Sequence, residues 1–296
     1  MNTEKELKEI VKDRYAKIAL QDKTENASSC CGATTPSNKV YNIMMEDYSE
    51  MNGYNEDADL GLGCGLPTQF AKISKGDTVI DLGSGAGNDC FVARHEAGET
   101  GKIIGVDFTP IMVKKARKNA EKLGYNNVEF REGDIDNMPI SDNIGDVIVS
   151  NCVLNLVPNK EKVINEIFRV LKPGGHFSIS DIVLVGNLPD TLKQDAEMYA
   201  GCVAGAIQKV DYLDYIKKAG FKDVEVQKEK TIDIPDDILL KYLSAEEITA
   251  FKNGTTGIFS ITVYAKKSGT SPKKEPVKLP ELEDDSCCNP TNSSCC

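Results

Sequence analysis

Histidine is nearly missing from this chain of 296 residues, which contains only His95 and His176. Two isolated histidines are too few for a zinc site built on imidazole ligands, and no base dyad is evident in the sequence. We expect both residues to serve in packing or on the surface. Any metal-like site in this chain must therefore use sulfur.

Long apolar runs and an excess of positive charge are missing as well. No apolar run reaches about 18 residues, and the polar start from Met1 to Glu6 lacks the basic and apolar stretches of a secretion signal. The net charge of -11 counts against a nucleic-acid or anionic-membrane surface, because phosphate binding draws on clustered Lys and Arg. We therefore expect a cytoplasmic protein that acts on small molecules, without nucleic-acid or membrane partners.

Cysteine, in contrast, is abundant, with 10 residues in the chain. Reducing compartments keep thiols free, so metal, metalloid or redox chemistry explains this number better than a disulfide scaffold does. The hydrophobic content of 40% and the length suit one large domain, or a domain with an appendage.

Strand and helix patterns alternate from Thr78 onward, which predicts βαβ units and a mostly parallel sheet. We expect strands over Thr78–Leu82, Lys102–Asp107, Val128–Arg131, Asp146–Asn151 and His176–Ile182. Expected helices cover Glu4–Leu20, Asp89–Glu96, Pro110–Leu123 and Lys160–Leu171. Beyond Val185 the pattern loosens into helices over Thr191–Ala206 and Tyr212–Ala219, and strands over Val224–Glu229 and Gly257–Lys267 that can extend or cap the sheet.

A glycine loop follows the first expected strand and opens a helix, with glycines at Gly83, Gly85 and Gly87. Such a loop lets the backbone approach a ligand closely and presents helix N-terminal N–H groups, which predicts a nucleotide-type site. It departs from the dinucleotide fingerprint, because Asn88 stands where the third glycine is required. Asp107 ends the second strand, where its carboxylate can accept hydrogen bonds from both hydroxyls of a ribose.

A further acid, Asp134, ends the third strand and can accept a hydrogen bond from an adenine amino group. Ile135 and Met138 can cover the adenine ring. One aspartate at a strand end serves a turn or a helix cap as often as a ligand. Acids at three successive strand ends, counting Asp81 and Asp107, favour the nucleotide site.

These motifs together resemble the class I S-adenosylmethionine-dependent methyltransferases, over roughly Gly61 to Asp181. The resemblance also includes Gly133-Asp134 and the segment Arg169-Val-Leu-Lys-Pro-Gly-Gly175. It implies an α/β fold with a Rossmann-like sheet and S-adenosylmethionine as methyl donor across the strand ends. The implied cofactor-binding residues are Asp81, Gly83, Gly85, Gly87, Asp107, Phe108, Asp134, Ile135 and Asn151.

The cysteine motifs carry a narrower resemblance, to the arsenite methyltransferases. They are Gly61-Leu-Gly-Cys64-Gly, Ser150-Asn-Cys152-Val-Leu-Asn and Ala200-Gly-Cys202-Val-Ala. The resemblance implies that Cys64, Cys152 and Cys202 hold As(III) for catalysis, together with either Cys30 or Cys31. It also implies a thiol reductant, arsenite and small thiols such as glutathione as partners, thioredoxin as a further partner, and a monomer that detoxifies arsenic.

The chemistry of arsenic gives a separate argument for sulfur ligands. Trivalent arsenic is soft, prefers three sulfur ligands in a pyramid and keeps a lone pair opposite them. A lone pair aimed along the sulfonium S–CH₃ axis needs orientation and no general base, and orientation can contribute roughly 7–11 kcal/mol. Loop placement and neighbouring glycines predict that Cys64, Cys152 and Cys202 are exposed, whereas Cys90 is expected to pack.

Two further expectations concern sulfur outside the catalytic set. Cys64 and Cys152 are expected near one pocket and to pair as a disulfide when oxidised. The polar end of the chain, rich in cysteine, is expected to be disordered and to help capture scarce arsenite. The predicted parts are thus an N-terminal helix and cysteine loop over 1–60, the S-adenosylmethionine-binding domain over 61–185, a smaller α+β substrate region over 186–267, and the tail over 268–296.

Two rival functions remain open at this point. One is a methyltransferase of the same fold for a quinone or another small acceptor, which would be insensitive to Cys152→Ser. The other is a non-catalytic metalloid scavenger, whose arsenic binding would survive Asp107→Ala without forming a methylated product. Fold analogy alone does not decide the substrate.

Overall fold

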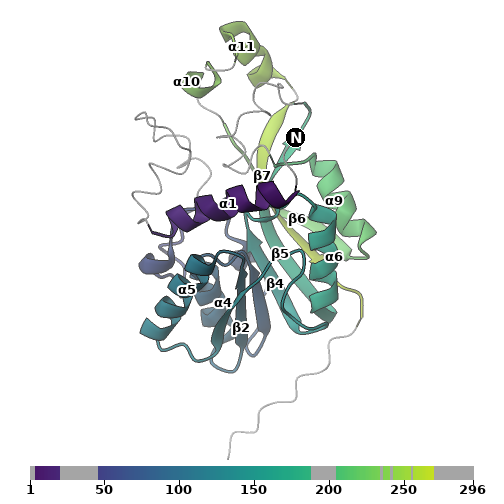
Figure 1. Ribbon diagram of the computed structural model, residues 1–296. Coiled ribbons are helices and arrows are strands. Elements are labelled where there is room, and N and C mark those ends of the chain that lie inside the picture. Colours follow the sequence, from purple (N-terminus) through teal and green to yellow (C-terminus); the bar gives the residue numbers. More distant parts are fainter. Residues whose placement is uncertain are drawn as a thin grey trace, which may run out of the picture.

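The computed structural model describes residues 4–20, 46–187, 205–233, 236–240, 243–254 and 256–269 (Figure 1). Its strands are β1 (Thr78–Leu82), β2 (Lys102–Asp107), β3 (Val128–Glu132), β4 (Gly145–Asn151), β5 (Leu171–Val185), β6 (Lys222–Thr231) and β7 (Gly257–Lys266). Its α-helices are α1 (Glu4–Ile18), α3 (Pro67–Phe70), α4 (Asn88–Ala97), α5 (Pro110–Lys122), α6 (Lys160–Val170), α9 (Lys209–Lys218), α10 (Asp236–Leu239) and α11 (Ala245–Asn253). Two 3-10 helices are η1 (Glu56–Ala58) and η2 (Leu154–Leu156).

All seven strands form one sheet in the order β3-β2-β1-β4-β5-β7-β6. β1 to β5 run parallel, and β7 runs antiparallel to both β5 and β6. The strand order reverses between β1 and β4, because β2 and β3 lie on one side of β1 and β5 lies beyond β4. In open α/β sheets the carboxyl ends of the strands at such a reversal border the ligand crevice. The topology therefore places a site beside the ends of β1 and β4.

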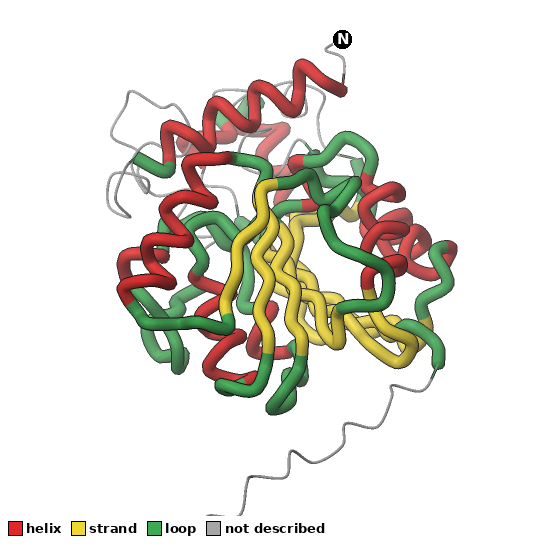
Figure 2. Tube along the Cα trace, turned by 60° about the horizontal axis from the view of Figure 1, so that its bottom comes forward, coloured by secondary structure: helices red, strands yellow, loops and turns green. Residues whose placement is uncertain are grey.

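Helices cover both faces of the sheet, as Figure 2 shows. Successive side chains of a strand point to opposite faces, so Val79 packs with residues of α4 and α5 and Ile80 packs with residues of α6 and α9. Both side chains are fully buried. Burial of a side chain of this size stabilises the fold by roughly 1.5–3 kcal/mol. The packed sheet thus provides a rigid support for the loops at the carboxyl ends of its strands.

Local chemistry sets the helix boundaries. α5 begins with Pro110, whose fixed φ suits a first helical turn. The side chain of Asn159 accepts a hydrogen bond from the Lys162 N–H and begins α6. Ser244 and Glu247 form a capping box that begins α11, a helix that was not predicted although its cap is visible in the sequence.

The strands that were predicted all exist, and β1 and β2 have the expected bounds. β5 is longer than the expected His176–Ile182 at both ends: it begins at Leu171, which pairs with Gly145 of β4, and its antiparallel pairing with β7 continues to Val185 opposite Gly257. The helix expected over Thr191–Ala206 lies mostly outside the described residues, as does the predicted tail. The division into four parts stays a prediction, although β6 and β7 belong to the same sheet as β1 to β5.

α1 lies across the carboxyl ends of the parallel strands, and α10 and α11 stand above the same end (Figure 1). The expected amphipathic helix is therefore confirmed, with Val11 and Ile18 buried on its inner face. No helix in the described ranges is both long and apolar enough to cross a lipid bilayer.

Candidate active site

The glycine loop between β1 and α4 has three glycines with positive φ, at +66° for Gly83, +52° for Gly85 and +102° for Gly87. A Cβ at Gly83 would overlap Val153, and one at Gly87 would lie 2.9 Å from the Phe130 ring. Nothing lies within 4 Å of a Cβ built on Gly85. The outer glycines are therefore required by packing, while the backbone at Gly85 is open to a ligand.

Asp107 fastens this loop to the end of β2. Its Oδ2 accepts a hydrogen bond from the Gly85 N–H at 3.0 Å, and its Oδ1 accepts one from the Thr109 N–H at 2.8 Å. Burial raises the pKa of Asp107, and these two backbone donors oppose the rise. Each carboxylate oxygen keeps a second lone pair that can accept from a ribose hydroxyl. Phe108, the next residue, lines the same cavity.

Two more aspartates lie buried behind the loop. Asp81 accepts a hydrogen bond from the Cys90 thiol at 3.2 Å, and its pKa is raised well above the usual value by burial and by the charge of Asp89. Burial raises the pKa of Asp89 to about 6, although a hydrogen bond from the Tyr48 hydroxyl at 2.9 Å opposes the rise.

The cavity lining is rich in acids. They are Asp59, Asp81, Asp89, Asp107 and Asp134, beside a single lysine among the described lining residues. This charge pattern favours a cationic ligand.

Cys64 and Cys152 are joined in a disulfide, with Cα atoms 5.8 Å apart. The expected pairing is therefore confirmed; Cys152 lines the cavity, whereas Cys64 is bonded to it without being among the lining residues. Cys152 follows β4 with φ of +60°, a conformation that costs a non-glycine residue roughly 1–2 kcal/mol. The Cys152 N–H donates a hydrogen bond to the Ser180 carbonyl at 2.8 Å, which holds Cys152 in this conformation.

The expected exposure of these two cysteines was wrong, since Cys64 is 1% and Cys152 is 5% exposed. The glycines beside Cys64 bring neighbours closer rather than opening the site to solvent. A Cβ on Gly63 would lie 2.5 Å from Asn151 Nδ2, and one on Gly65 would lie 2.5 Å from Ser180 Oγ. The Gly-Cys-Gly segment is thus pressed against β4 and β5.

Asn151, the last residue of β4, clamps this segment. Its Oδ1 accepts from the N–H of Cys64 at 3.0 Å and of Gly65 at 3.2 Å. Its Nδ2 donates to the Gly65 carbonyl at 2.8 Å and to the Tyr48 hydroxyl at 2.6 Å. Ser260 Oγ donates to the Cys64 carbonyl at 2.6 Å from β7. Asn151 lines the cavity as predicted, but its polar atoms hold Cys64, and cofactor contact stays a prediction.

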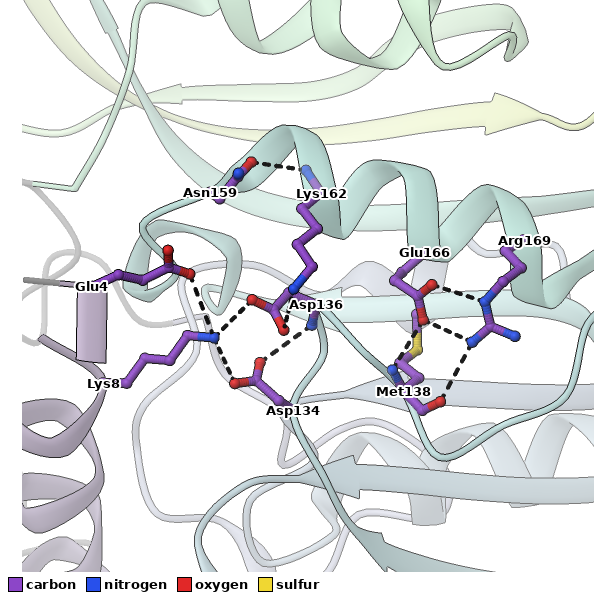
Figure 3. Close-up of polar contacts among 9 residues, drawn as sticks. All are labelled: Glu4, Lys8, Asp134, Asp136, Met138, Asn159, Lys162, Glu166 and Arg169. Carbon is purple, nitrogen blue, oxygen red and sulfur yellow. Dashed lines mark hydrogen bonds and ion pairs between the residues drawn. The ribbon is translucent and has the colours of Figure 1, made fainter.

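The segment after β3 forms another wall of the cavity. Asp134 Oδ2 accepts from Lys8 Nζ of α1 at 2.7 Å, and its Oδ1 accepts from the Asp136 N–H at 3.2 Å (Figure 3). Ile135 lines the cavity, as expected of an adenine-covering residue. Met138 packs instead in the core beneath and is not among the lining residues.

The residues expected to pack do so. Cys90 is a fully buried free thiol. His176 lies with Nε2 2.6 Å from the Ala71 carbonyl oxygen, and its ring packs against Tyr264. His95 is exposed on α4. Neither histidine lines the cavity.

Three predicted arsenic ligands, Cys30, Cys31 and Cys202, lie outside the described residues. Within the described ranges no group of three or more His, Cys, Asp or Glu side chains could hold a metal ion. Gly205, three residues after Cys202, is described, and a Cβ there would collide with the Asn155 carbonyl oxygen. The chain at Gly205 therefore packs directly on η2, which itself follows Cys152.

Several cavity residues were not predicted, namely Lys8, Val11, Tyr15, Tyr48, Asp59 and Asp89. Asp89 had a local signal, because it stands in the first turn of the helix that the glycine loop opens. The others reach the cavity by long-range packing and carry no local motif. Ser84 Oγ, also on the cavity wall, is buried without a hydrogen-bond partner in the described part of the chain. The open Gly85 backbone, Asp107 and this hydroxyl together fit the predicted nucleoside methyl donor.

A methyltransferase domain family matches residues 73–232 of the chain. The arsenite methyltransferase of Halobacterium salinarum is 43% identical over 234 residues, which are 75% of this chain and 59% of that protein. The arsenite methyltransferase of Aquipseudomonas alcaligenes is 34% identical over 79% of this chain and 68% of its own length. This chain therefore spans about three fifths to two thirds of these two relatives.

A solved structure is similar as well. The crystal structure of an arsenic(III) S-adenosylmethionine methyltransferase from Chlamydomonas reinhardtii superposes with a TM-score of 0.59 and 32% identity. The match covers 71% of this chain and 69% of the algal one. The chain belongs to the arsenite methyltransferase family.

Proposed function

We propose that this chain transfers a methyl group from S-adenosylmethionine to thiol-bound As(III), giving methylated arsenicals and S-adenosylhomocysteine in arsenic detoxification. The observation that carries the proposal is the meeting of Cys64 and Cys152, with Cα atoms 5.8 Å apart, beside the cavity that the glycine loop lines. Sulfur from two distant segments converges where a methyl donor is expected. The names of the similar proteins support the same substrate and donor.

S-adenosylmethionine, when bound, supplies a methyl group on a positively charged sulfur. The Gly85 backbone and Asp107 would hold its nucleoside, and Ile135 would cover the adenine. Asp89, whose pKa is about 6, is ionised at neutral pH, and its negative charge on the cavity wall favours a cationic donor over its neutral product. These residues bind and orient, and no residue is required to remove a proton.

Arsenite binds when each thiol displaces one hydroxide of As(OH)₃ as water, so three cysteines release three waters. Both Cys64 and Cys152 must be reduced for this, and we assign Cys202 as the third ligand. Cys202 precedes Gly205 by three residues in the sequence, and three residues of chain span at most about 11 Å. Gly205 packs against Asn155, three residues beyond Cys152. This constraint supports a shared site.

Methyl transfer then joins the arsenic lone pair to the methyl carbon, and the electrons of the breaking S–C bond stay on sulfur. The positive charge moves from sulfur to arsenic, which is formally oxidised by two electrons. Return to trivalent arsenic needs two electrons, which a pair of thiols supplies on forming a disulfide. A thiol reductant is therefore part of the proposal, with glutathione or thioredoxin as its source. A monomer in the cytoplasm is the expected setting.

The test is incubation of the reduced protein with labelled S-adenosylmethionine and arsenite, followed by arsenic speciation. We expect labelled methylarsenicals, with loss of product in Cys152→Ser and Cys202→Ser. The matched control replaces Cys295 and Cys296 with serine, which removes two thiols without touching the proposed site. It should methylate normally at saturating arsenite.

Two results would contradict the proposal. Methylation of a quinone that persists in Cys152→Ser would indicate a carbon-acceptor enzyme. Arsenic binding that survives Asp107→Ala, in a protein that never forms methylated product, would indicate a scavenger.

A further inference from the structure

The inner face of α1 forms part of the cavity wall. Lys8, Val11 and Tyr15 line the same cavity as the glycine loop and Asp107. Their spacing of three and four residues places them on one side of the helix. The opposite side, with Asp13 and Lys17, is exposed. The helix thus turns one consistent face to the site.

This face reaches both ends of the site. Val11, which is 5% exposed, belongs to the same buried apolar cluster as Cys64 and Cys152. Tyr15 packs against that cluster and also against the cluster that contains Ala86 of the glycine loop. α1 therefore reaches from the disulfide-bonded pair Cys64 and Cys152 to the glycine loop.

Lys8 holds the N-terminal half of α1 in place through two ion pairs to the segment that follows β3 (Figure 3). Lys8 Nζ lies 2.7 Å from Asp134 Oδ2 and 2.7 Å from Asp136 Oδ2. Asp136 has a side chain only 4% exposed, and Lys162 of α6 approaches it at 3.4 Å from the other side. Burial alone would lower the pKa of Lys8, but its hydrogen bonds to the two aspartates raise it. Lys8 thus forms a charged link from α1 to Asp134 and Asp136 in the segment after β3.

Docking stabilises α1. A helix of 15 residues is marginal when isolated in water, so packing against the rest of the chain supplies most of its stability. Val11 and Tyr15 line the cavity as well as packing on the two apolar clusters, so a bound nucleoside would lie against both side chains.

We propose that α1 is a closing wall of the cofactor site, in which Val11 and Tyr15 contact the bound cofactor and Lys8 latches the helix to Asp134 and Asp136. Cofactor binding and helix docking then stabilise each other, because each supplies the other's contact surface. Lys8 is a positioning residue. The inference rests on the cofactor part of the proposed function and not on arsenic.

The test compares binding of S-adenosylhomocysteine by calorimetry in the reduced, full-length protein and in Lys8→Met. We expect about tenfold weaker binding in the variant, the factor that one lost charged contact of about 1.4 kcal/mol gives. Lys8→Arg should restore affinity to within about threefold, because it keeps the charge. Lys17→Met removes the same charge from the exposed side and should leave affinity unchanged.

Hydrogen exchange supplies a second readout without any substitution. Saturating S-adenosylhomocysteine should slow amide exchange throughout Glu4–Ile18 in the unmodified protein. Unchanged affinity in Lys8→Met, or exchange in α1 that ignores the ligand, would overturn the inference and leave arsenic methylation untouched. If the unmodified protein fails to bind S-adenosylhomocysteine, both this inference and the proposed function are wrong.

Discussion

Replacement of Asn151 tests how Cys64 is held in place. Asn151→Ala removes two acceptor contacts, to the N–H groups of Cys64 and Gly65, and three donor contacts, to the Gly65 carbonyl, the Tyr48 hydroxyl and, at 3.5 Å, Asp89. A hydrogen bond contributes roughly 0.5–1.5 kcal/mol net, so loss of the four shorter contacts should lower the free energy of unfolding by about 2–6 kcal/mol. For a chain of this size that lowers Tm by at least about 4 °C.

The substitution should also weaken arsenite binding, because the Cys64 backbone loses the contact that fixes its N–H. Asn151→Asp keeps both acceptor contacts, so it should spare arsenite binding more than Asn151→Ala does, but it turns an oxygen toward the Gly65 carbonyl and Asp89 and should lower stability at least as much. Asn253→Ala, at the exposed end of α11, is the matched control. Calorimetry and equilibrium dialysis with arsenite under reductant measure the two effects. If Asn151→Ala melts with Asn253→Ala and binds arsenite equally well, the clamp has no role in placing Cys64.

Four further outcomes are expected. The pKa of Asp89 is about 6 in the folded protein and lower in the unfolded chain, so its ionisation destabilises the fold as pH rises from about 4 to 7. Over that range Asp89→Asn should gain stability relative to the unmodified protein, by up to about 3 kcal/mol in urea titrations. A stability difference that does not change with pH would refute this. Gly85→Ala has no steric clash, because its Cβ meets nothing within 4 Å, so it should fold with a loss of about 1–2 kcal/mol from its φ of +52°; it should lose S-adenosylhomocysteine binding in calorimetry, and normal binding would show that the loop does not contact the ligand. Without reductant the disulfide of Cys64 and Cys152 should block turnover, and activity with both shown oxidised by mass spectrometry would contradict this. Deletion of 286–296 should leave single-turnover methylation intact but lower capture at scarce arsenite, whereas an inactive truncated protein would contradict a role limited to capture.

The sequence predicted the parallel half of the sheet well because local chemistry determines it. β1 and β2 are buried on both faces, and their short apolar runs stop where glycine or a capping segment begins. The length of β5 was not predictable in the same way, since its last residues are extended by pairing with β7, about 70 residues later in the chain. Local sequence thus determines where these strands occur, whereas tertiary pairing determines how far β5 extends.

The same distinction applies to the candidate site, where some contacts follow from local sequence and others from tertiary packing. The glycine loop and Asp107 follow from residues close to strand ends, and the structure joins them by the hydrogen bond from Gly85. The clamp on Cys64 joins residues 87 apart in the chain, so no spacing rule reveals it. The wrong expectation of exposed cysteines came from reading flanking glycines as openness, when their missing side chains allow Asn151 and Ser180 to close over Cys64.

X-ray absorption at the arsenic edge tests the central claim most directly. The reduced protein would be loaded with arsenite, freed of small thiols and measured beside Cys152→Ser. Convergent cysteines predict a first shell of three sulfur atoms in the unmodified protein, and an oxygen in place of one sulfur in the variant. An arsenic shell of oxygen alone in the unmodified protein, or an unchanged sulfur shell in the variant, would contradict the account.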